Sequence, residues 1–169
     1  MKSLDAVPDI DWARLAAFID GEGCIYIRKF TRQRCGRVSV DFSVGLQITN
    51  TDPRLMCWLS NTFGGRVAVF RRETRNARWK TRFDWFVQRK TAAELLRRCS
   101  QHLLLKREQA DLVIAFQDTT LVGGRRKGLP RGTTLPPSVF AERQRIKETV
   151  SALNTRGVDS NLLDWRMPA

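Results

Sequence analysis

Apolar positions along the chain switch between a helical period and a strand period, and the switches outline its expected elements. Across residues 9–20 the apolar side chains recur at helical spacing, and glycines follow. Residues 24–34 then alternate, with Ile25 and Ile27 on one face and polar, basic or aromatic residues on the other. A second alternating run ends at Thr49. This part of the chain is therefore predicted to be a helix followed by an antiparallel hairpin with one open, basic face.

The same succession then repeats. Asp52 and Pro53 are typical of a helix start, and two glycines at 64 and 65 are expected to end that helix. The inward residues expected in the hairpin that follows are Val67, Val69, Phe83, Trp85 and Val87. Further helices are expected over residues 91–105, 106–117 and 138–153. Residues 119–137, rich in Gly, Pro and Arg, are either a loop that touches phosphate or a solvated linker, and they lack the spacing of a P-loop.

This order of elements predicts an α+β fold, αββαββα, built on one four-stranded antiparallel sheet. Helices are expected on one face of the sheet, while arginines, small polar residues and aromatic residues line the other. A twisted ribbon with such a face can lie in the major groove of DNA and read base edges. We expect one domain over residues 1–169, with its core over residues 9–153. The C-terminal tail, residues 154–169, is left without an expected fold.

Charge and composition narrow the functional classes. The 169 residues carry 30 Lys+Arg against 17 Asp+Glu, a formal charge of +13. This excess indicates a polyanionic partner, although arginine-rich usage is also expected of a GC-rich genome. An apolar fraction of 42% argues against disorder. The sequence has no apolar run long enough for a membrane span and no secretory signal, so we expect a cytoplasmic protein that is not secreted. The arginine-rich usage favours a prokaryotic or phage host over an organellar location. Four dispersed cysteines and one histidine exclude a zinc framework and a histidine-based site.

Residues 15–23, Leu-Ala-Ala-Phe-Ile-Asp-Gly-Glu-Gly, resemble the LAGLIDADG signature of homing endonucleases and their maturase relatives. The departures include Ala17, Phe18 and Glu22, which stand where the signature has Gly, Leu and Asp. The order of elements agrees with that family over roughly residues 9–153. The single copy of the motif resembles the class that works as a homodimer.

The resemblance implies a contact between two copies of the first helix. Such helices pack side by side in the family, and the row Ala13, Ala17 and Gly21 supplies small residues for a close approach. The same row is also compatible with ordinary helix-favouring alanine. The expected dimer-interface residues are Trp12, Ala13, Ala16, Ala17 and Asp20.

The resemblance also implies a metal-dependent site. Glu22 and the backbone carbonyl of Gly21 are the implied ligands of Mg²⁺, or of Mn²⁺, with Ca²⁺ as the ion of a non-cleaving complex. Asn50, Lys106 and Arg54 are implied to complete the catalytic group by positioning water and neutralising charge. The Glu22 side chain is one methylene longer than the commoner Asp, which makes its positioning the open point of this assignment.

The open face of the sheet supplies the expected DNA contacts. Gln47 is interpreted as a base reader, because an amide can contact adenine bidentately. The expected DNA-binding residues are Tyr26, Arg28, Phe30, Arg32, Arg34, Arg37, Ser39, Asp41, Ser43, Gln47, Arg66, Ala68, Phe70, Arg72, Lys80, Arg82, Asp84 and Phe86.

The resulting hypothesis is a homing endonuclease of an intron or a free-standing gene. It would hydrolyse both strands of double-stranded DNA with a divalent metal, as a homodimer on a long, partly palindromic site. The alternative is a non-catalytic binder of the same fold, either an RNA maturase or a DNA-binding regulator. A third reading, a basic structural protein, is disfavoured by the motif helix and by the regular alternation of the sheet face.

Overall fold

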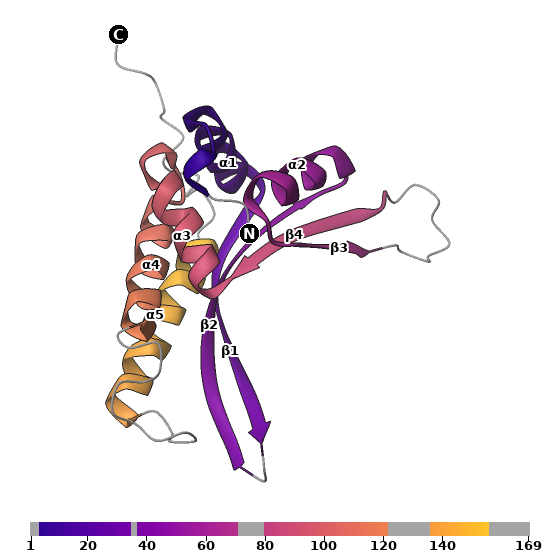
Figure 1. Ribbon diagram of the computed structural model, residues 1–169. Coiled ribbons are helices and arrows are strands. Elements are labelled where there is room, and N and C mark those ends of the chain that lie inside the picture. The colour runs from indigo at the N-terminus through magenta and orange to yellow at the C-terminus, as the bar shows by residue number, and fades with distance from the viewer. Residues whose placement is uncertain (1–3, 35–36, 71–79, 122–135, 156–169) are drawn as a thin grey trace, which may run out of the picture.

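The computed structural model describes residues 4–34, 37–70, 80–121 and 136–155 of the chain (Figure 1). Its elements follow in the order η1 (Leu4–Ala6), α1 (Asp9–Glu22), β1 (Gly23–Arg34), β2 (Arg37–Asn50), α2 (Pro53–Phe63), β3 (Arg66–Phe70), β4 (Arg82–Gln88), α3 (Arg89–Cys99), η2 (Ser100–His102), α4 (Arg107–Leu121) and α5 (Pro137–Thr155). The predicted α+β class and the repeated helix–hairpin order are confirmed.

The four strands form one antiparallel sheet in the order β1-β2-β4-β3. The β1–β2 hairpin is paired along its whole length, from Gly23 with Ile48 to Arg34 with Arg37. By contrast, β4 pairs only with residues 45–50 of β2. The two hairpins therefore share one end of β2 and then diverge, so that the outer half of β1–β2 extends well beyond the second hairpin (Figure 1).

The hydrophobic core lies where helices cover the sheet. Helices α3, α4 and α5 run along one side of the sheet in Figure 1, with α1 and α2 near the shared end of the hairpins. Val44, Leu46, Ile48 and Trp85 face this layer and are completely buried. The inward row of β2 is not buried throughout, since Val38 in the outer half is 61% exposed.

The second hairpin also departs from the expected burial. Val67 and Val69 lie on the same side of the sheet as the buried Trp85 and yet are 39% and 51% exposed. Strand β3 is at the edge of the sheet, and the helix nearest to it, α2, makes few contacts with it. Alternation correctly placed these residues on one face, but it carries no information about where that face is covered.

Two helix boundaries differ from expectation. Helix α1 continues through Gly21 and ends at Glu22, with Gly23 beginning the first strand. The helix expected over residues 91–105 ends at Cys99 and is followed by a 3-10 turn, after which Leu104 and Leu105 are 88% and 75% exposed.

Other expectations fall partly or wholly beyond the described residues. Helix α4 extends to Leu121, three residues into the segment expected to be a loop. Most of that segment, residues 122–135, and the tail from residue 156 lie outside the described residues. No helix in the described ranges is both long and apolar enough to cross a membrane.

Asp52 and two glycines fix α2 between the hairpins. The Asp52 carboxylate accepts a hydrogen bond from the Arg54 backbone N–H at 2.8 Å and caps the helix, which confirms the predicted start. At the other end Gly64 and Gly65 have φ angles of 74° and 89°, in the region that favours glycine. The buried Trp85 indole donates to the Gly64 carbonyl at 2.7 Å, so the turn is held against the sheet.

Candidate active site and nucleic-acid interface

The end of α1 and the end of β2 meet through one short hydrogen bond. Glu22 is the last residue of α1, and its carboxylate accepts a bond from the Asn50 side-chain amide at 2.5 Å. The other end of that amide, the Asn50 carbonyl oxygen, accepts from the Asp52 backbone N–H at 2.8 Å. Asn50 is therefore held from both ends, and it holds the exposed carboxylate of Glu22 in one place.

Lys106 lies at the same end of α1. Its ammonium donates to the carbonyl oxygens of Ile19 and Gly23 at 2.8 and 2.6 Å, where the helix dipole is negative. Burial lowers the pKa of this ammonium, and the nearby groups of Asp20 and Cys24 oppose that change. The structure thus brings Glu22, Asn50 and Lys106, which are far apart in sequence, to one corner of the fold.

Asp20 anchors the segment that carries Lys106. Its carboxylate accepts backbone N–H bonds from Leu104, Leu105 and Lys106 at 2.8, 3.2 and 3.0 Å. These three bonds tie the turn before α4 to the end of α1 and explain why the helix expected there is interrupted. The sequence had assigned Asp20 to the dimer interface, and this fold-stabilising role was missed.

Arg54 is engaged with Asp52 rather than with Glu22 among the residues described. Its guanidinium pairs with the Asp52 carboxylate at 2.6 Å on the surface. Hydrogen bonds from the Arg54 side chain and backbone hold the pKa of Asp52 at about 2. Arg54 therefore borders the corner as an exposed cation on the first turn of α2.

One face of α1 is left uncovered by the described residues of the chain. Ala17 and Gly21 are exposed and Ala13 is half-buried. A side-chain carbon added at Gly21 would meet nothing within 4 Å. Trp12 and Ala16, also expected at a dimer interface, are 6% and 0% exposed and belong to the chain's own core, which leaves them no surface for a partner.

The open face of the sheet carries the expected alternation of basic, polar and aromatic residues. Arg28 lies opposite Ser43, and Phe30 lies opposite Asp41. Tyr26 lies opposite Gly45, and a side-chain carbon at that glycine would come within 2.4 Å of the tyrosine ring. Glycine at position 45 therefore lets the Tyr26 ring lie flat across the second strand, which flattens this part of the surface.

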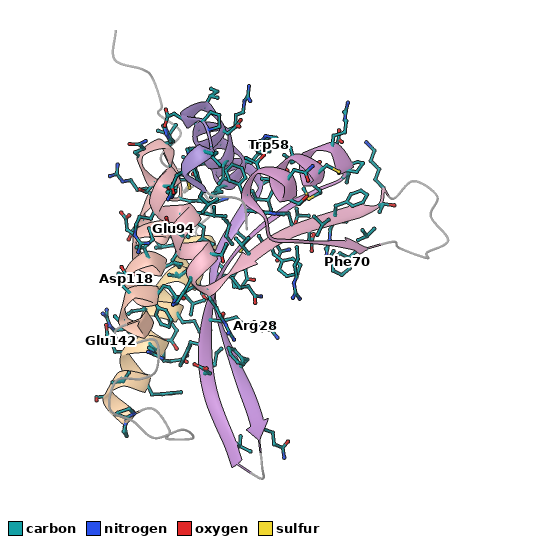
Figure 2. All side chains as sticks on the ribbon, viewed as in Figure 1. Arg28, Trp58, Phe70, Glu94, Asp118 and Glu142 are labelled. Atoms are coloured by element: carbon teal, nitrogen blue, oxygen red, sulfur yellow. The ribbon has the colours of Figure 1, made fainter. Side chains whose placement is uncertain are left out.

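The charges are separated between the two sides of the molecule. In Figure 2, Arg28 and Phe70 project from the strands on the side away from the helices, whereas Glu94, Asp118 and Glu142 lie on the helices. The helical acids are paired with arginines, as in Arg97–Asp118 at 2.9 Å. No ion pair joins Arg28 or Arg66 within the described part of the chain, so positive charge remains on the sheet side.

Asp84 corrects the predicted set of exposed DNA contacts. It lies on the open face but is only 5% exposed, because Gln47, Thr49 and Arg82 surround its carboxylate. Thr49 was missed altogether. The signal that would have found the cluster is the pairing of Thr49 with Asp84 across β2 and β4, a long-range register that the sequence pattern does not contain.

The remaining expected contacts fall into two groups. Exposed or half-buried side chains of the open face are Arg66, Ala68, Phe70, Lys80, Arg82 and Phe86. Arg32, Arg34, Arg37 and Ser39 occupy positions on the outer halves of β1 and β2, where the structure describes the strands only. Arg72 lies outside the described residues.

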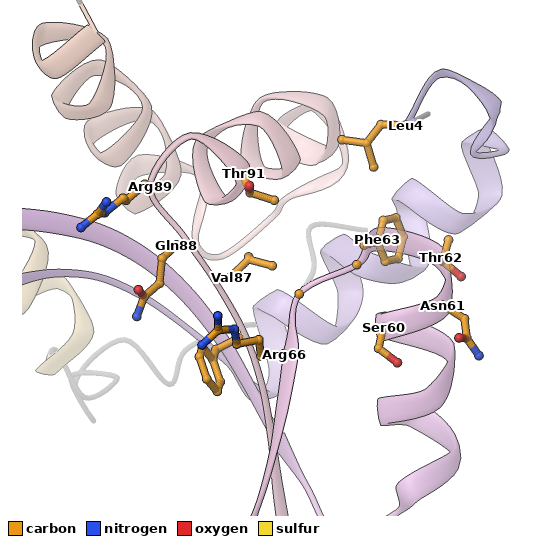
Figure 3. Close-up of a pocket in the computed structure, with 13 residues that line it drawn as sticks. Leu4, Ser60, Asn61, Thr62, Phe63, Arg66, Val87, Gln88, Arg89 and Thr91 are labelled. Carbon is orange, nitrogen blue, oxygen red and sulfur yellow. The ribbon is translucent and has the colours of Figure 1, made fainter. Parts of the chain in front are cut away.

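A cavity of about 600 Å³ lies beside this face, between the end of α2, the starts of β3 and α3, and the end of β4 (Figure 3). Its lining includes Phe63, Arg66, Gln88 and Arg89, and contains no Asp or Glu among the residues that the structure describes. The cavity does not include Glu22, Asn50 or Lys106 in its lining. It is therefore separate from the corner at the end of α1.

A single chain offers only some of the oxygen ligands that a divalent metal ion needs. Nowhere in residues 4–34, 37–70, 80–121 and 136–155 do three His, Cys, Asp or Glu side chains come together as a metal cluster. The Glu22 carboxylate and the last carbonyls of α1 are hard oxygen donors of the kind that Mg²⁺ prefers. The donor chemistry fits, and one chain offers one such carboxylate at this place.

Comparison with solved structures defines the class of fold, which is that of the LAGLIDADG homing endonucleases. No family description and no curated protein matches the sequence, whereas 71 chains of solved structures match the fold. The resemblance inferred from residues 15–23 is thereby confirmed for the fold.

Three of these structures show the extent of the likeness. The homing endonuclease I-CvuI, solved with its DNA target in the presence of calcium, superposes with a TM-score of 0.64 at 20% identity, over 89% of this chain and 85% of its own. The archaeal intron-encoded I-Vdi141I, solved with DNA, gives 0.53 at 12% identity, over 86% and 98%. The LAGLIDADG enzyme I-LtrWI, bound to target DNA, gives 0.57 at 18% identity, over 80% of this chain and 42% of its longer chain.

Proposed function

We propose that this protein is a site-specific DNA endonuclease of the homing type that cleaves both strands of its target. The observation that carries the proposal is the exposed carboxylate of Glu22 at the end of α1, held by Asn50 at 2.5 Å beside Lys106. The basic open face of the sheet and the fold shared with I-CvuI and I-Vdi141I support it. We propose that residues 1–169 act as one domain, cytoplasmic and encoded in an intron or a free-standing gene.

Glu22 and the Gly21 carbonyl would hold a divalent cation, with Mg²⁺ or Mn²⁺ supporting cleavage and Ca²⁺ supporting binding alone. When bound, such an ion stabilises charge on the attacked phosphate and lowers the pKa of a water molecule. Asn50 keeps the Glu22 carboxylate in position, which compensates for the extra methylene relative to Asp. Lys106 and Arg54 would offset negative charge around the scissile phosphate.

A homodimer would complete this site. Each chain contributes one Glu22, and two strands of a duplex need two sites. The uncovered face of α1, with Ala13 and Ala17, lets a second α1 approach closely. Leu104 and Leu105, which are exposed and tied to the end of α1 by Asp20, add apolar area beside that face.

The open sheet face would then contact a long, partly palindromic site, with one half-site for each chain. Arg28 and the other basic residues of the face would meet phosphates and base edges in the major groove. The outer half of β1–β2 would extend this contact away from the centre of the site. Its residues Arg32, Arg34, Arg37 and Ser39 are included in the proposed surface by their strand positions.

A second candidate is a non-catalytic binder with the same surface, an RNA maturase or a DNA-binding regulator. The favouring observation is that the Glu22 carboxylate and the Lys106 ammonium both have partners inside the chain. Those hydrogen bonds would serve to close the end of α1 even without catalysis. Only a measurement of cleavage separates the two candidates.

Glu22→Gln is the decisive variant. We expect it to abolish cleavage while leaving DNA binding intact or slightly stronger, because the swap removes one negative charge near phosphate. Loss of several kcal/mol of charge stabilisation corresponds to a rate fall of roughly several hundredfold or more. Cleavage of a plasmid library with Mg²⁺ would first reveal the target, and single-turnover rates on that target would then be compared.

Glu22→Asp is the matched control, since it restores the acid of the family signature and is expected to cleave. Mixed dimers with one Glu22→Gln chain should cut slowly or nick one strand. Cleavage by Glu22→Gln at the wild-type rate would overturn the catalytic role of Glu22. No cleavage by the wild-type protein, with specific binding intact, would favour the non-catalytic binder.

A further inference from the structure

A closed hydrogen-bond cluster lies in the middle of the open sheet face, around Asp84 on β4. Gln47 donates from its Nε2 to Asp84 Oδ2 at 3.0 Å. Thr49 donates from its hydroxyl to Asp84 Oδ1 at 3.0 Å. Arg82 donates from its Nε to Oδ1 and from its Nη2 to Oδ2, both at 3.1 Å. Both carboxylate oxygens are therefore occupied, and the group is nearly inaccessible to solvent.

The cluster fixes which end of the Gln47 amide faces outward. A carboxylate paired with Arg82 has no hydrogen to donate, so the Gln47 NH₂ group, and not its carbonyl, must face Asp84. The one hydroxyl hydrogen of Thr49 is used on Asp84, so the Thr49 oxygen can only accept the second Gln47 N–H, at 3.3 Å. Both N–H groups of Gln47 are consumed, and its carbonyl oxygen is the atom left to a ligand.

The same cluster fixes Arg82 so that it presents hydrogen-bond donors outward, whereas Gln47 presents an acceptor. The edge formed by its Nε and Nη2 faces Asp84, which leaves the edge formed by Nη1 and Nη2 directed away from the carboxylate. The guanidinium also lies over the Phe70 ring, 4.5 Å from its centroid, and this contact restricts its rotation. About half of the Arg82 side chain is exposed, so this donor edge can reach a partner.

We propose that Asp84 is a positioning residue that sets the hydrogen-bond polarity of two base-reading side chains, making Gln47 an acceptor and Arg82 a donor fork. The inference rests on the proposed function, because it requires the open face to enter the major groove. In that groove only adenine and cytosine present an amino group, whereas guanine presents two acceptors to an arginine fork. Gln47 thus selects adenine or cytosine, and Arg82 selects guanine.

This assignment differs from the usual contact of a glutamine with DNA. An unconstrained Gln both donates to and accepts from adenine, and so prefers adenine to all other bases. The Asp84 cluster removes the donating half of that contact. The wild-type protein is therefore expected to treat adenine and cytosine alike at the Gln47 position and to reject guanine and thymine.

The test is a binding selection on randomised duplex DNA in the absence of a cleavage-supporting metal, followed by affinities for single-base variants of the selected site. Gln47→Ala locates the base pair read by Gln47, because preference is lost there alone. At that pair the wild-type protein should favour adenine and cytosine by about two- to tenfold, as for one hydrogen bond. At the Arg82 pair, guanine should be favoured by about five- to a hundredfold.

Asp84→Asn should invert the base preference at the Gln47 pair and weaken the preference for guanine at the Arg82 pair. An amide at position 84 donates to the Gln47 carbonyl, which turns the Gln47 NH₂ outward and favours guanine or thymine. It also removes the charge that holds Arg82. Thr49→Ser keeps the hydroxyl and is the matched control, with an unchanged profile. Thr49→Val releases one Gln47 N–H and should favour adenine over cytosine, a second readout should Asp84→Asn fail to fold.

The outcomes separate the two levels of the proposal. Sequence-specific binding with an adenine-only preference at the Gln47 pair, or profiles of Asp84→Asn and Thr49→Val identical to the wild type, would overturn the role of Asp84 and leave the DNA-binding function standing. An absence of any sequence-specific DNA binding would overturn the proposed function, and this inference with it.

Discussion

Lys106 combines a structural contact with a place in the proposed site. Its two bonds to carbonyl oxygens close the end of α1. Lys106→Met should lower the free energy of unfolding by about 1 kcal/mol, the usual net worth of such bonds at a partly exposed site. It should slow cleavage less than Glu22→Gln does, because the carboxylate remains. Urea unfolding and single-turnover cleavage measure the two effects.

Lys90→Met, at an exposed position on α3, is the control for loss of one positive charge. Complete loss of cleavage by Lys106→Met with unchanged stability would show that the ammonium acts on the substrate and not mainly on the helix end.

Cys99 gives the chain a pH dependence at alkaline pH. Its thiol is completely buried in the core, and burial raises its pKa to about 12. In the unfolded chain the thiol ionises near its ordinary pKa of 9.0, so above that pH the unfolded state binds fewer protons than the folded state. Stability should therefore fall between about pH 9 and 12, by up to about 1.4 kcal/mol per pH unit.

Cys99→Ala should remove this component, so that the difference in unfolding free energy between variant and wild type narrows as pH rises from 8 to 10. Cys57→Ala, at an exposed position on α2, should leave the slope unchanged. Parallel pH profiles for the wild-type and Cys99→Ala proteins would contradict the assignment.

At the scale of elements, the uncovered face of α1 predicts association. Ala17→Leu places a bulky side chain on the exposed row of small residues, where overpacking costs about 1–3 kcal/mol at a close helix contact. We expect the wild-type protein to be a dimer by light scattering at micromolar concentration and the variant to dissociate or to cleave poorly. Ala141→Leu, the same substitution at an exposed position on α5, provides the surface control.

A wild-type mass of a single chain would contradict the proposed interface. A dimer that Ala17→Leu leaves intact would place the contact on another surface.

The elements that could be predicted from sequence are those fixed by local chemistry. Asp52 and Pro53 fixed the start of α2, since capping and proline geometry act within a few residues. The alternation of apolar and polar residues correctly predicted which residues share a face in each of the four strands. The break after Cys99 was missed because it depends on the Asp20 carboxylate, which is distant along the chain and accepts three backbone N–H groups.

The candidate site likewise has residues that could be predicted from the sequence and one whose surroundings could not. The motif pointed to Glu22, and the matched segments pointed to Asn50 and Lys106, which the fold brings to the same end of α1. Asp84 was expected to be exposed, because the sequence does not contain the β2–β4 register that surrounds it with Gln47 and Thr49. Burial of a polar side chain on an open face is a property of pairing between distant strands.

For the whole molecule, the distribution of charge predicts strong salt dependence of DNA binding. The formal charge is +13, and helix arginines such as Arg97 and Arg145 already have acidic partners, so we expect the phosphate contacts to come from the sheet side. Each phosphate neutralised adds about −0.9 to the slope of log K against log salt concentration. Affinity measured from low to physiological salt should fall with a slope of several units.

Arg145→Ala, on the helical side, should leave that slope unchanged, whereas replacing Arg28 should relax selectivity at one base pair in each half-site by about 1–3 kcal/mol. A flat dependence on salt would be incompatible with the sheet face as the binding surface.

The divergence of the two hairpins affects which positions of this molecule tolerate amino-acid substitution. The outer half of β1–β2 extends beyond the helices, and even the apolar Val38 there is largely exposed. Substitutions at exposed positions away from the core usually alter stability by less than about 0.5 kcal/mol. We therefore expect mutational tolerance to be concentrated in these strands. Under the proposed function they meet the outer parts of the target, so new specificities could evolve there, one position at a time, on an unaltered scaffold.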